Sequence, residues 1–239
     1  GRSCHAQHLW LEKAPRKPDT IDMLMNTHEA RLDALRKELA LQGLDGFVIP
    51  ISDEHMSEYV GGYAQRLEWL TGFGGSAGTA VVLTNPAREP AAAIFIDGRY
   101  TLQVRDQVDG RYYAYESVPQ TSVAKWLGAN APEGAKIGYD AWLHGKAWVV
   151  AASKALEAVG GTLVAVSSNP VDAVWQDRPA PSPAPALVHT DEFAGQSSQS
   201  KREAISAWLI EQKLDTAVIS ALDSIAWLLN IRGEDVERT

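Results

Sequence analysis

Cysteine and long apolar runs are the scarcest features of this sequence. The chain has 239 residues and one cysteine, Cys4, so it cannot form an intrachain disulfide. A reducing, cytoplasmic compartment is therefore the default expectation. No stretch approaches the roughly 18 consecutive apolar residues that span a bilayer, and the first residues lack the charged start, apolar middle and cleavage site of a secretory signal. We expect no membrane partner.

Basic residues are too few and too scattered for a nucleic-acid surface. The sequence has 22 Lys and Arg against 30 Asp and Glu, a formal net charge of -8. It contains no Lys/Arg block and no stripe of alternating basic and aromatic residues, which are the features that phosphate-backbone binding requires. Nucleic acid is therefore excluded as an expected partner.

Metal-binding motifs are also absent. Cys4, His5 and His8 stand close together, but a tetrahedral site needs three or four convergent ligands, and none of the usual spacings occurs. The sequence has no HExxH and no paired cysteines. We expect neither a metal nor a cofactor in this chain.

An internal repeat is the most informative feature that is present. Each copy contains a helix, a short turn, a strand and a tryptophan, carried by Leu35, Leu39, Leu44, Val48, Ile49 and Trp69 in the first copy and by Ile205, Leu209, Leu214, Val218, Ile219 and Trp227 in the second. Such long spacing predicts two related domains rather than a solenoid. From Leu214 to Thr239 the second copy is too short to build a core of its own. We expect its apolar run, residues 225–229, to dock on the first domain or on a second chain in a homodimer.

Hydrophobic periodicity and turn residues predict an α/β domain with a mixed sheet flanked by helices. Helices are expected at residues 28–42, 122–128 and 145–159, and strands at 46–51, 80–83, 91–96, 112–116, 136–139 and 162–166. Strands 80–83 and 91–96 should pair antiparallel across the turn between them.

Proline marks the boundary between the two domains. Five prolines between residues 169 and 185 predict a stiff linker outside the core. We expect an extension at 1–26 that is poorly ordered or derived from cloning, a first domain at 27–174, a proline-rich linker at 175–197 and the truncated start of a second domain at 198–239.

The glycine-rich run at residues 72–78 fits two catalytic or cofactor patterns. Gly74-x-Ser76-x-Gly78 fits the nucleophile elbow of serine hydrolases, and Gly72-x-Gly74-x-x-Ala77 fits part of a dinucleotide-binding fingerprint. Both patterns require a helix after the turn, whereas residues 79–83 have the composition of a strand. We expect these glycines to supply positive φ values, and keep a hydrolase using Ser76 as the alternative.

Two residues are candidate ligand contacts. Arg99, in Asp97-Gly98-Arg99-Tyr100, follows a predicted strand and offers a planar fork suited to a carboxylate or carbonyl; the alternative is an ordinary salt bridge with Asp97 or Asp106. His55 follows the first strand among carboxylates, where it could be a general base, a ligand or a hydrogen-bonded loop histidine. The chain contains no complete catalytic apparatus.

Five motifs in order resemble those of the three-domain cytosolic Xaa-Pro aminopeptidases (aminopeptidase P). They comprise residues 52–59, 66–80, 97–100, 169–179 and 221–233. The sequence departs from the family's usual start before Thr27 and has its own Gly61-Gly62-Tyr63 loop.

The resemblance implies a creatinase/prolidase N-terminal-type domain followed by the start of a related one. In that family, a pita-bread catalytic domain holds two Mn ions through two Asp, one His and two Glu, and removes the first residue from peptides with proline second. None of those ligands lies in this chain. The resemblance therefore implies a non-catalytic N-terminal region, with Arg99 as a substrate contact and His55 as a weaker candidate, or a binding module derived from the domain.

Overall fold

The structure is a computed structural model that describes residues 27–85 and 87–236. The predicted extension at 1–26 lies outside the described residues. The first part of the chain contains β1 (Gly46–Pro50), β2 (Thr79–Leu83), β3 (Ala92–Ile96), β4 (Ala114–Ser117), β5 (Lys136–Tyr139) and β6 (Thr162–Ala165), with helices α2 (His28–Leu41), α3 (Arg66–Thr71), α4 (Gln103–Gln107), α5 (Val123–Asn130), α6 (Lys146–Glu157) and α7 (Pro170–Val174). Short 3-10 helices lie at Gly62–Ala64, Gly98–Tyr100 and Ala141–Leu143.

The six strands form one mixed sheet in the order β4-β3-β2-β1-β5-β6. The central strand β1 pairs antiparallel with β2 and parallel with β5. β2 and β3 pair antiparallel, as predicted, while β3–β4 and β5–β6 are parallel pairs. The predicted α/β class with a mixed sheet is confirmed.

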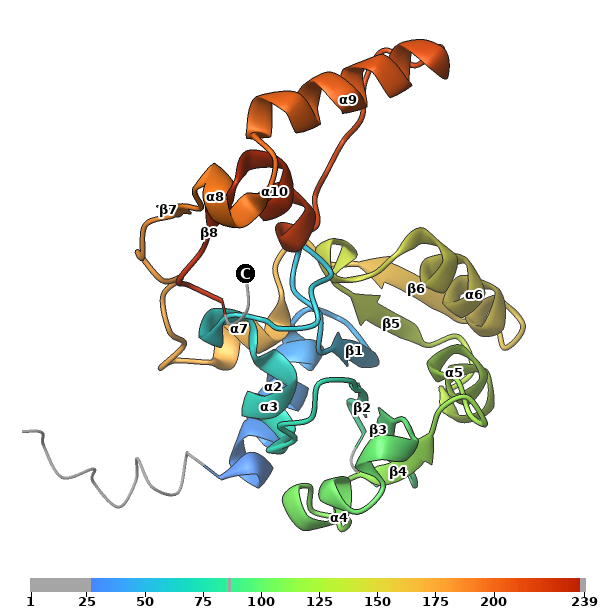
Figure 1. Ribbon diagram of the computed structural model, residues 1–239. Coiled ribbons are helices and arrows are strands. Elements are labelled where there is room, and N and C mark those ends of the chain that lie inside the picture. The colour runs from blue at the N-terminus through green and yellow to red at the C-terminus, as the bar shows by residue number, and fades with distance from the viewer. Residues whose placement is uncertain (1–26, 86, 237–239) are drawn as a thin grey trace, which may run out of the picture.

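Helices cover both faces of this sheet, so β1 is apolar on both sides (Figure 1). Phe47 and Ile49 pack on the face covered by α2, α3 and α7, whereas Val48 packs on the opposite face with the side chains of α5 and α6. All five residues of β1 are buried. A strand buried on both faces reads as a continuous apolar run, as observed here.

The five prolines between residues 169 and 185 do not all mark a linker outside the core, because residues 170–175 form a helix and its end packed on the first domain. Pro170 begins α7, where its missing N–H costs nothing, and the Asn169 side chain accepts a hydrogen bond from the Val171 amide. Val171 is completely buried, and Trp175 stacks on Trp69 with ring centroids 5.3 Å apart. The proline-rich segment that follows contains β7 (Leu187–Val188) and α8 (Asp191–Ala194).

The predicted repeat is visible in the backbone. Helix α9 (Ser198–Glu211) has 14 residues, like α2, and begins 170 positions after it. Ser197 caps α9 through the Ser200 amide as Thr27 caps α2 through the Ala30 amide. Helix α10 (Leu222–Leu229) then ends at the left-handed Asn230, as α3 ends at the left-handed Gly72.

The two copies differ after these helices. In the described residues the second copy has a single strand, β8 (Ile231–Arg232), paired antiparallel with β7. In Figure 1, α9 projects away from the six-stranded sheet. Ala226 in α10 is buried, but Trp227 remains 52% exposed. No helix in the described residues is long and apolar enough to cross a membrane.

Candidate functional site

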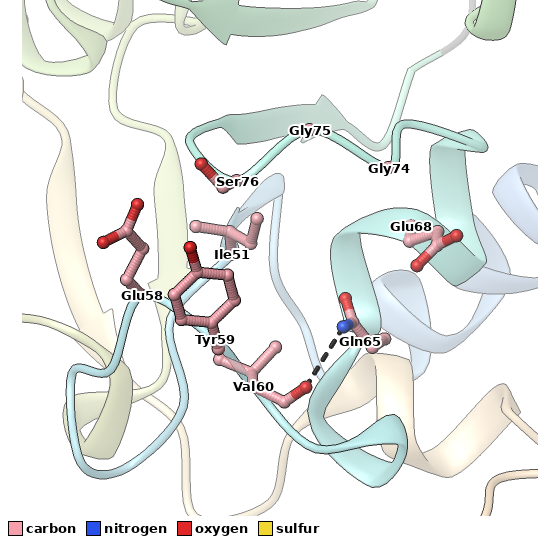
Figure 2. Close-up of a pocket in the computed structure, with 9 residues that line it drawn as sticks. All are labelled: Ile51, Glu58, Tyr59, Val60, Gln65, Glu68, Gly74, Gly75 and Ser76. Atoms are coloured by element: carbon pink, nitrogen blue, oxygen red, sulfur yellow. Dashed lines mark hydrogen bonds between the residues drawn. The ribbon is translucent and has the colours of Figure 1, made fainter. Parts of the chain in front are cut away.

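A cavity of about 260 Å³ lies beside the end of β1. Three segments line it: the loop after β1, the start of helix α3 and the glycine-rich turn before β2. The lining residues are Ile51, Glu58, Tyr59, Val60, Gln65, Glu68, Gly74, Gly75 and Ser76. In Figure 2, Glu58 and Tyr59 lie on one side, Gln65 and Glu68 on the other, and Ser76 at the top. Sequence reasoning named Ser76 but did not identify this cavity, because its lining comes from three separate segments.

The loop that carries Glu58 and Tyr59 is organised by Asp53. This carboxylate is 1% exposed and accepts hydrogen bonds from the amides of His55 and Ser57, at 3.0 and 3.1 Å. Met56, between them, has φ of +57°, a left-handed conformation that is rare for a long side chain. Such a backbone persists only where its surroundings hold it, here through the two bonds to Asp53.

The glycine-rich turn is shaped by close packing. A Cβ on Gly75 would lie 2.4 Å from Cζ of Phe73 and 2.9 Å from Cδ1 of Tyr100. Gly72 has φ of +83°, as expected for a helix C-terminus, and the turn leads into strand β2. The expected positive φ is found at Gly72 alone; the expectation is wrong for Gly74, Gly75 and Gly78, and Gly75 is required by close packing instead. The helix that a nucleophile elbow or a dinucleotide fingerprint needs is replaced by a strand.

Ser76 is hydrogen-bonded to Tyr100. Its amide donates to the Tyr100 hydroxyl at 3.1 Å, and its Oγ lies 2.8 Å from the same oxygen. These hydrogen bonds hold the pKa of Tyr100 below its ordinary value. The contacts described for Ser76 place a phenol beside its Oγ, and not the imidazole base of a serine nucleophile.

Arg99 projects from the 3-10 turn that follows β3, with its side chain 61% exposed. Its Nη2 lies 2.8 Å from Oδ2 of Asp97, so the salt bridge named as an alternative is present. This hydrogen bond raises the pKa of Arg99 and lowers that of Asp97, and Glu58 contributes further to the raised pKa of Arg99. The connection of this turn to the cavity runs through the next residue, Tyr100, whose hydroxyl contacts Ser76 of the cavity lining.

The same four-residue motif occurs a second time, at residues 109–112, which sequence reasoning overlooked. Arg111 pairs with Asp109 and lies over the Tyr112 ring at 5.2 Å, just as Arg99 pairs with Asp97 and lies over its tyrosine ring at 5.0 Å. The ion pair between the arginine and the aspartate is therefore a property of the four-residue motif itself. What distinguishes Arg99 is its place in the turn after β3, next to Tyr100, which contacts Ser76 of the cavity lining.

His55 contacts the second copy of the repeat. Its Nδ1 lies 3.2 Å from the backbone carbonyl of Ser220, so the loop after β1 contacts the second copy of the repeat. No hydrogen bond or ion pair described in the structure joins His55 to Arg99. The structure thus supports the hydrogen-bonded loop histidine that was one of the interpretations of this residue.

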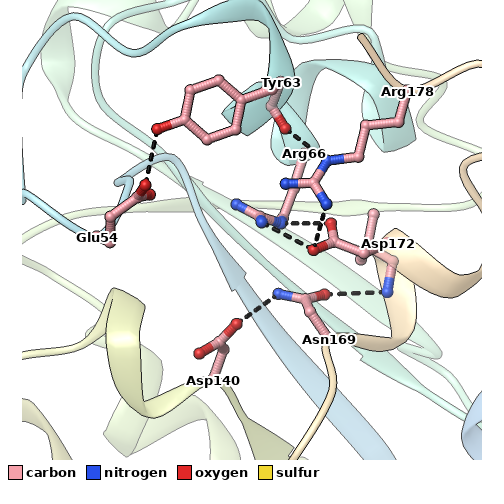
Figure 3. Close-up of polar contacts among 8 residues, drawn as sticks. Glu54, Tyr63, Arg66, Asp140, Asn169, Asp172 and Arg178 are labelled. Carbon is pink, nitrogen blue, oxygen red and sulfur yellow. Dashed lines mark hydrogen bonds and ion pairs between the residues drawn. The ribbon is translucent and has the colours of Figure 1, made fainter. Parts of the chain in front are cut away.

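A polar network joins helix α3 and the 3-10 turn before it to helix α7 (Figure 3). Arg66 donates two hydrogen bonds to Asp172, at 2.7 and 2.9 Å, and Arg178 reaches the same carboxylate at 2.8 Å. Arg178 also donates to the Tyr63 carbonyl, and the Tyr63 hydroxyl donates to Glu54 at 2.8 Å. Burial, together with this bond to the Glu54 carboxylate, raises the pKa of Tyr63 to about 12. The network holds α3, and with it Gln65 and Glu68, against α7.

The described residues do not fit a dinuclear metal centre. Among them, no group of three or more His, Cys, Asp or Glu side chains could hold a metal ion. The two carboxylates of the cavity, Glu58 and Glu68, belong to no such group.

Family models and known proteins give one consistent result. The model of the creatinase/prolidase N-terminal domain matches residues 31–174, and a second model of that description matches residues 177–239. The chain is 36% identical over 208 residues to human Xaa-Pro aminopeptidase 2, which covers 86% of this chain and 30% of that protein. It is 37% identical over 207 residues to Arabidopsis thaliana aminopeptidase P1, covering 86% and 31%.

A solved structure agrees with these matches. The X-prolyl aminopeptidase of Caenorhabditis elegans, described as a cytosolic enzyme with a di-nuclear active site, superposes with a TM-score of 0.79 at 33% identity, over 88% of this chain and 36% of that one. The chain thus spans about a third of the length of the relatives it matches. With its mixed sheet, its repeated helix and two consecutive matches to the same kind of domain, the chain belongs to the creatinase/prolidase N-terminal domain family.

Proposed function

We propose that this chain is the non-catalytic N-terminal region of a cytoplasmic Xaa-Pro aminopeptidase. The longer protein would release the first residue from peptides with proline in second position. The observation that carries the proposal is the likeness to the C. elegans X-prolyl aminopeptidase, at 33% identity and a TM-score of 0.79 over 88% of the chain. The two family matches in tandem support the same reading.

The chemistry would belong to a catalytic domain outside this sequence. That domain would hold two Mn ions, which would supply Lewis-acid chemistry for peptide hydrolysis. The described residues of this chain offer no group that could hold such metals. Its own contribution would be to position the peptide, which makes it a binding and orienting unit.

Arg99 is the residue we propose for that contact. Its side chain is 61% exposed at the end of a strand, and its described hydrogen bonds engage Nε and Nη2 with Asp97. The Nη1 group can donate to a peptide carbonyl or carboxylate. The guanidinium plane is already oriented for this, because Asp97 holds its other side. The role of His55 in substrate binding stays a weaker proposal, because its ring is directed to the Ser220 carbonyl.

An assay of two proteins tests the proposal. The longer protein should hydrolyse an Xaa-Pro peptide in the presence of Mn, whereas the 239-residue chain should show no turnover on the same peptide. Turnover by the short chain at the rate of the longer protein would overturn the non-catalytic assignment. Labelling of Ser76 by a serine-reactive phosphonate would instead support the hydrolase alternative.

A further inference from the structure

The cavity beside the end of β1 combines aliphatic surface with acidic walls. Ile51 and Val60 supply the aliphatic part, and in the view of Figure 2 Ile51 lies between the walls that carry Glu58 and Glu68. Both glutamates are exposed and line the cavity from opposite sides. None of the lining residues is a lysine, an arginine or a histidine. The cavity therefore presents apolar surface and negative charge to a ligand.

The two glutamates differ in the charges beside them. Glu58 contributes to the raised pKa of Arg99, so it lies within electrostatic reach of that guanidinium. The Glu68 carboxylate takes part in no hydrogen bond or ion pair described among residues 27–85 and 87–236. Its Oε1 would lie 3.5 Å from a Cβ at Gly74, which places it against the glycine-rich turn. Glu68 is therefore the acceptor that stays available for a cation from outside the chain.

Contacts within the chain fix the walls of the cavity. Gln65 donates through Nε2 to the Val60 carbonyl at 3.2 Å, which ties the start of α3 to the loop after β1. Ser76 Oγ lies 2.8 Å from the Tyr100 hydroxyl. Tyr100 belongs to the same 3-10 turn as Arg99, so the cavity and the proposed peptide contact lie on connected segments. Because these contacts form the cavity without a ligand, binding there costs less conformational entropy.

The volume and the lining favour one kind of ligand. The cavity has about 260 Å³, less than the about 300 to 1,000 Å³ of pockets that enclose a drug-sized molecule, so it suits a single side chain. Lysine and arginine bury an aliphatic stem along apolar surface and keep the cation at a polar edge. An acidic side chain would be repelled by the glutamates, and a neutral aliphatic one would gain nothing from them.

We infer that the cavity binds a lysine or arginine side chain of the peptide, with its stem on Ile51 and Val60 and its cation at Glu68. Glu68 is then a specificity-determining residue that gives the longer protein a preference for peptides with a basic residue near their N-terminus. This inference rests on the proposed function, which supplies the peptide.

Peptide kinetics on the longer protein test the inference. Xaa-Pro peptides with lysine at the first, third or fourth position are compared with the same peptides carrying norleucine, which keeps the aliphatic stem and lacks the charge. At one of these positions kcat/KM should be about tenfold higher for the lysine peptide, near the lower end for a charge-assisted hydrogen bond because Glu68 is exposed. The preference should fall to about twofold or less in Glu68→Gln, and shrink in the wild type when salt is raised to about 1 M.

Charge reversal and a remote carboxylate complete the test. Glu68→Lys should reverse the preference, so that a peptide with glutamate at the same position becomes a better substrate than its glutamine counterpart. Glu157→Gln, at an exposed position on α6, should keep the preference of the wild type.

The outcomes separate this inference from the proposed function. Hydrolysis with equal kcat/KM for lysine and norleucine at every position, or a preference that survives Glu68→Gln, would overturn the inference and leave the function intact. If the longer protein hydrolyses no Xaa-Pro peptide, the function fails, and NMR titration of the 239-residue chain with Nα-acetyl-lysine amide decides the site by itself. Shifts of the Gly74 and Ser76 amide signals that disappear in Glu68→Gln would retain the site, and no shifts in the wild type would overturn it.

Discussion

Arg66 donates two hydrogen bonds to Asp172, 106 positions further along the chain, and joins helix α3 to helix α7. The Arg66 side chain is 7% exposed and that of Asp172 is 24% exposed. Arg178 uses the same carboxylate. Asp172 thus neutralises two guanidinium groups, one of which is almost completely removed from water.

Replacing Asp172 by alanine should destabilise the protein strongly. The substitution leaves the charge of Arg66 buried without its partner. Such a loss lowers the free energy of unfolding by about 3 to 5 kcal/mol for a fully buried pair, and we expect about 3 kcal/mol for this partly exposed pair. Urea unfolding measures the loss. Asp109→Ala is the matched control, because Asp109 pairs with the exposed Arg111 and its removal should leave the unfolding midpoint almost unchanged. Equal effects of the two substitutions would contradict the importance of burial here.

Replacing Arg99 by alanine in the longer protein should lower kcat/KM about ten- to hundred-fold on an Xaa-Pro peptide, if this arginine makes a charge-assisted hydrogen bond to the substrate. The melting temperature should hardly change, because the side chain is 61% exposed. Steady-state kinetics and thermal unfolding of one variant measure both quantities.

Arg111→Ala is the control for that experiment, since Arg111 has the same motif, the same ion pair and the same position over a tyrosine ring. It lies in the loop before β4, away from the turn that contacts Ser76, and its loss should leave kcat/KM unchanged. An Arg99 variant with normal kinetics and a lowered melting temperature would reduce Arg99 to a structural role.

Replacing Gly75 by alanine should destabilise the first domain by about 1 to 3 kcal/mol, the usual cost of forcing an extra carbon into a filled space. The new Cβ would meet Phe73 at 2.4 Å and Tyr100 at 2.9 Å. Gly98→Ala is the control, because nothing lies within 4 Å of the Cβ it would add. Urea unfolding of the two variants compares them, and equal midpoints would show that the aromatic rings move aside at no cost.

The sequence predicted the elements whose signals are local. The helix at 28–41 has its cap residue and a left-handed glycine after it, and β1 is a continuous apolar run, so both were found nearly to the residue. The repeat was found because its apolar positions recur at a constant spacing through the helix and strand. The antiparallel pairing of β2 and β3 followed from the turn residues between them.

What the sequence did not reveal depends on contacts between distant segments. The cavity is lined by segments that only the sheet brings together, and the packing of Trp175 on Trp69 joins residues 106 positions apart. Proline was read as a linker signal at Pro170, where it is also an ordinary first residue of a helix. The ion pair of Arg99 with Asp97 was foreseen as an alternative, but not its repetition at Arg111.

The last prediction concerns the pH dependence of stability through His144. Its Nδ1 lies 2.9 Å from the Asp140 carbonyl, its Nε2 is buried without a partner in the described structure, and its ring lies 4.0 Å from the Trp148 ring. Burial lowers the pKa of His144 below its ordinary value of 6.5, against a smaller opposing effect of Asp140. The neutral imidazole is therefore favoured in the folded state.

A histidine whose folded pKa is depressed contributes stability above its unfolded pKa and loses it as the pH falls through the folded value. The melting temperature of the wild type should therefore fall when the pH is lowered from about 7.5 to about 5, below the unfolded pKa near 6.5. His144→Phe keeps an aromatic ring against Trp148 and removes the titration, so this variant should show a smaller fall. His28→Phe should also reduce the fall in melting temperature, because burial, and then the charge of Arg31, lower the pKa of His28. A His144→Phe profile parallel to that of the wild type would mean that the imidazolium finds solvent or a new partner in the folded protein.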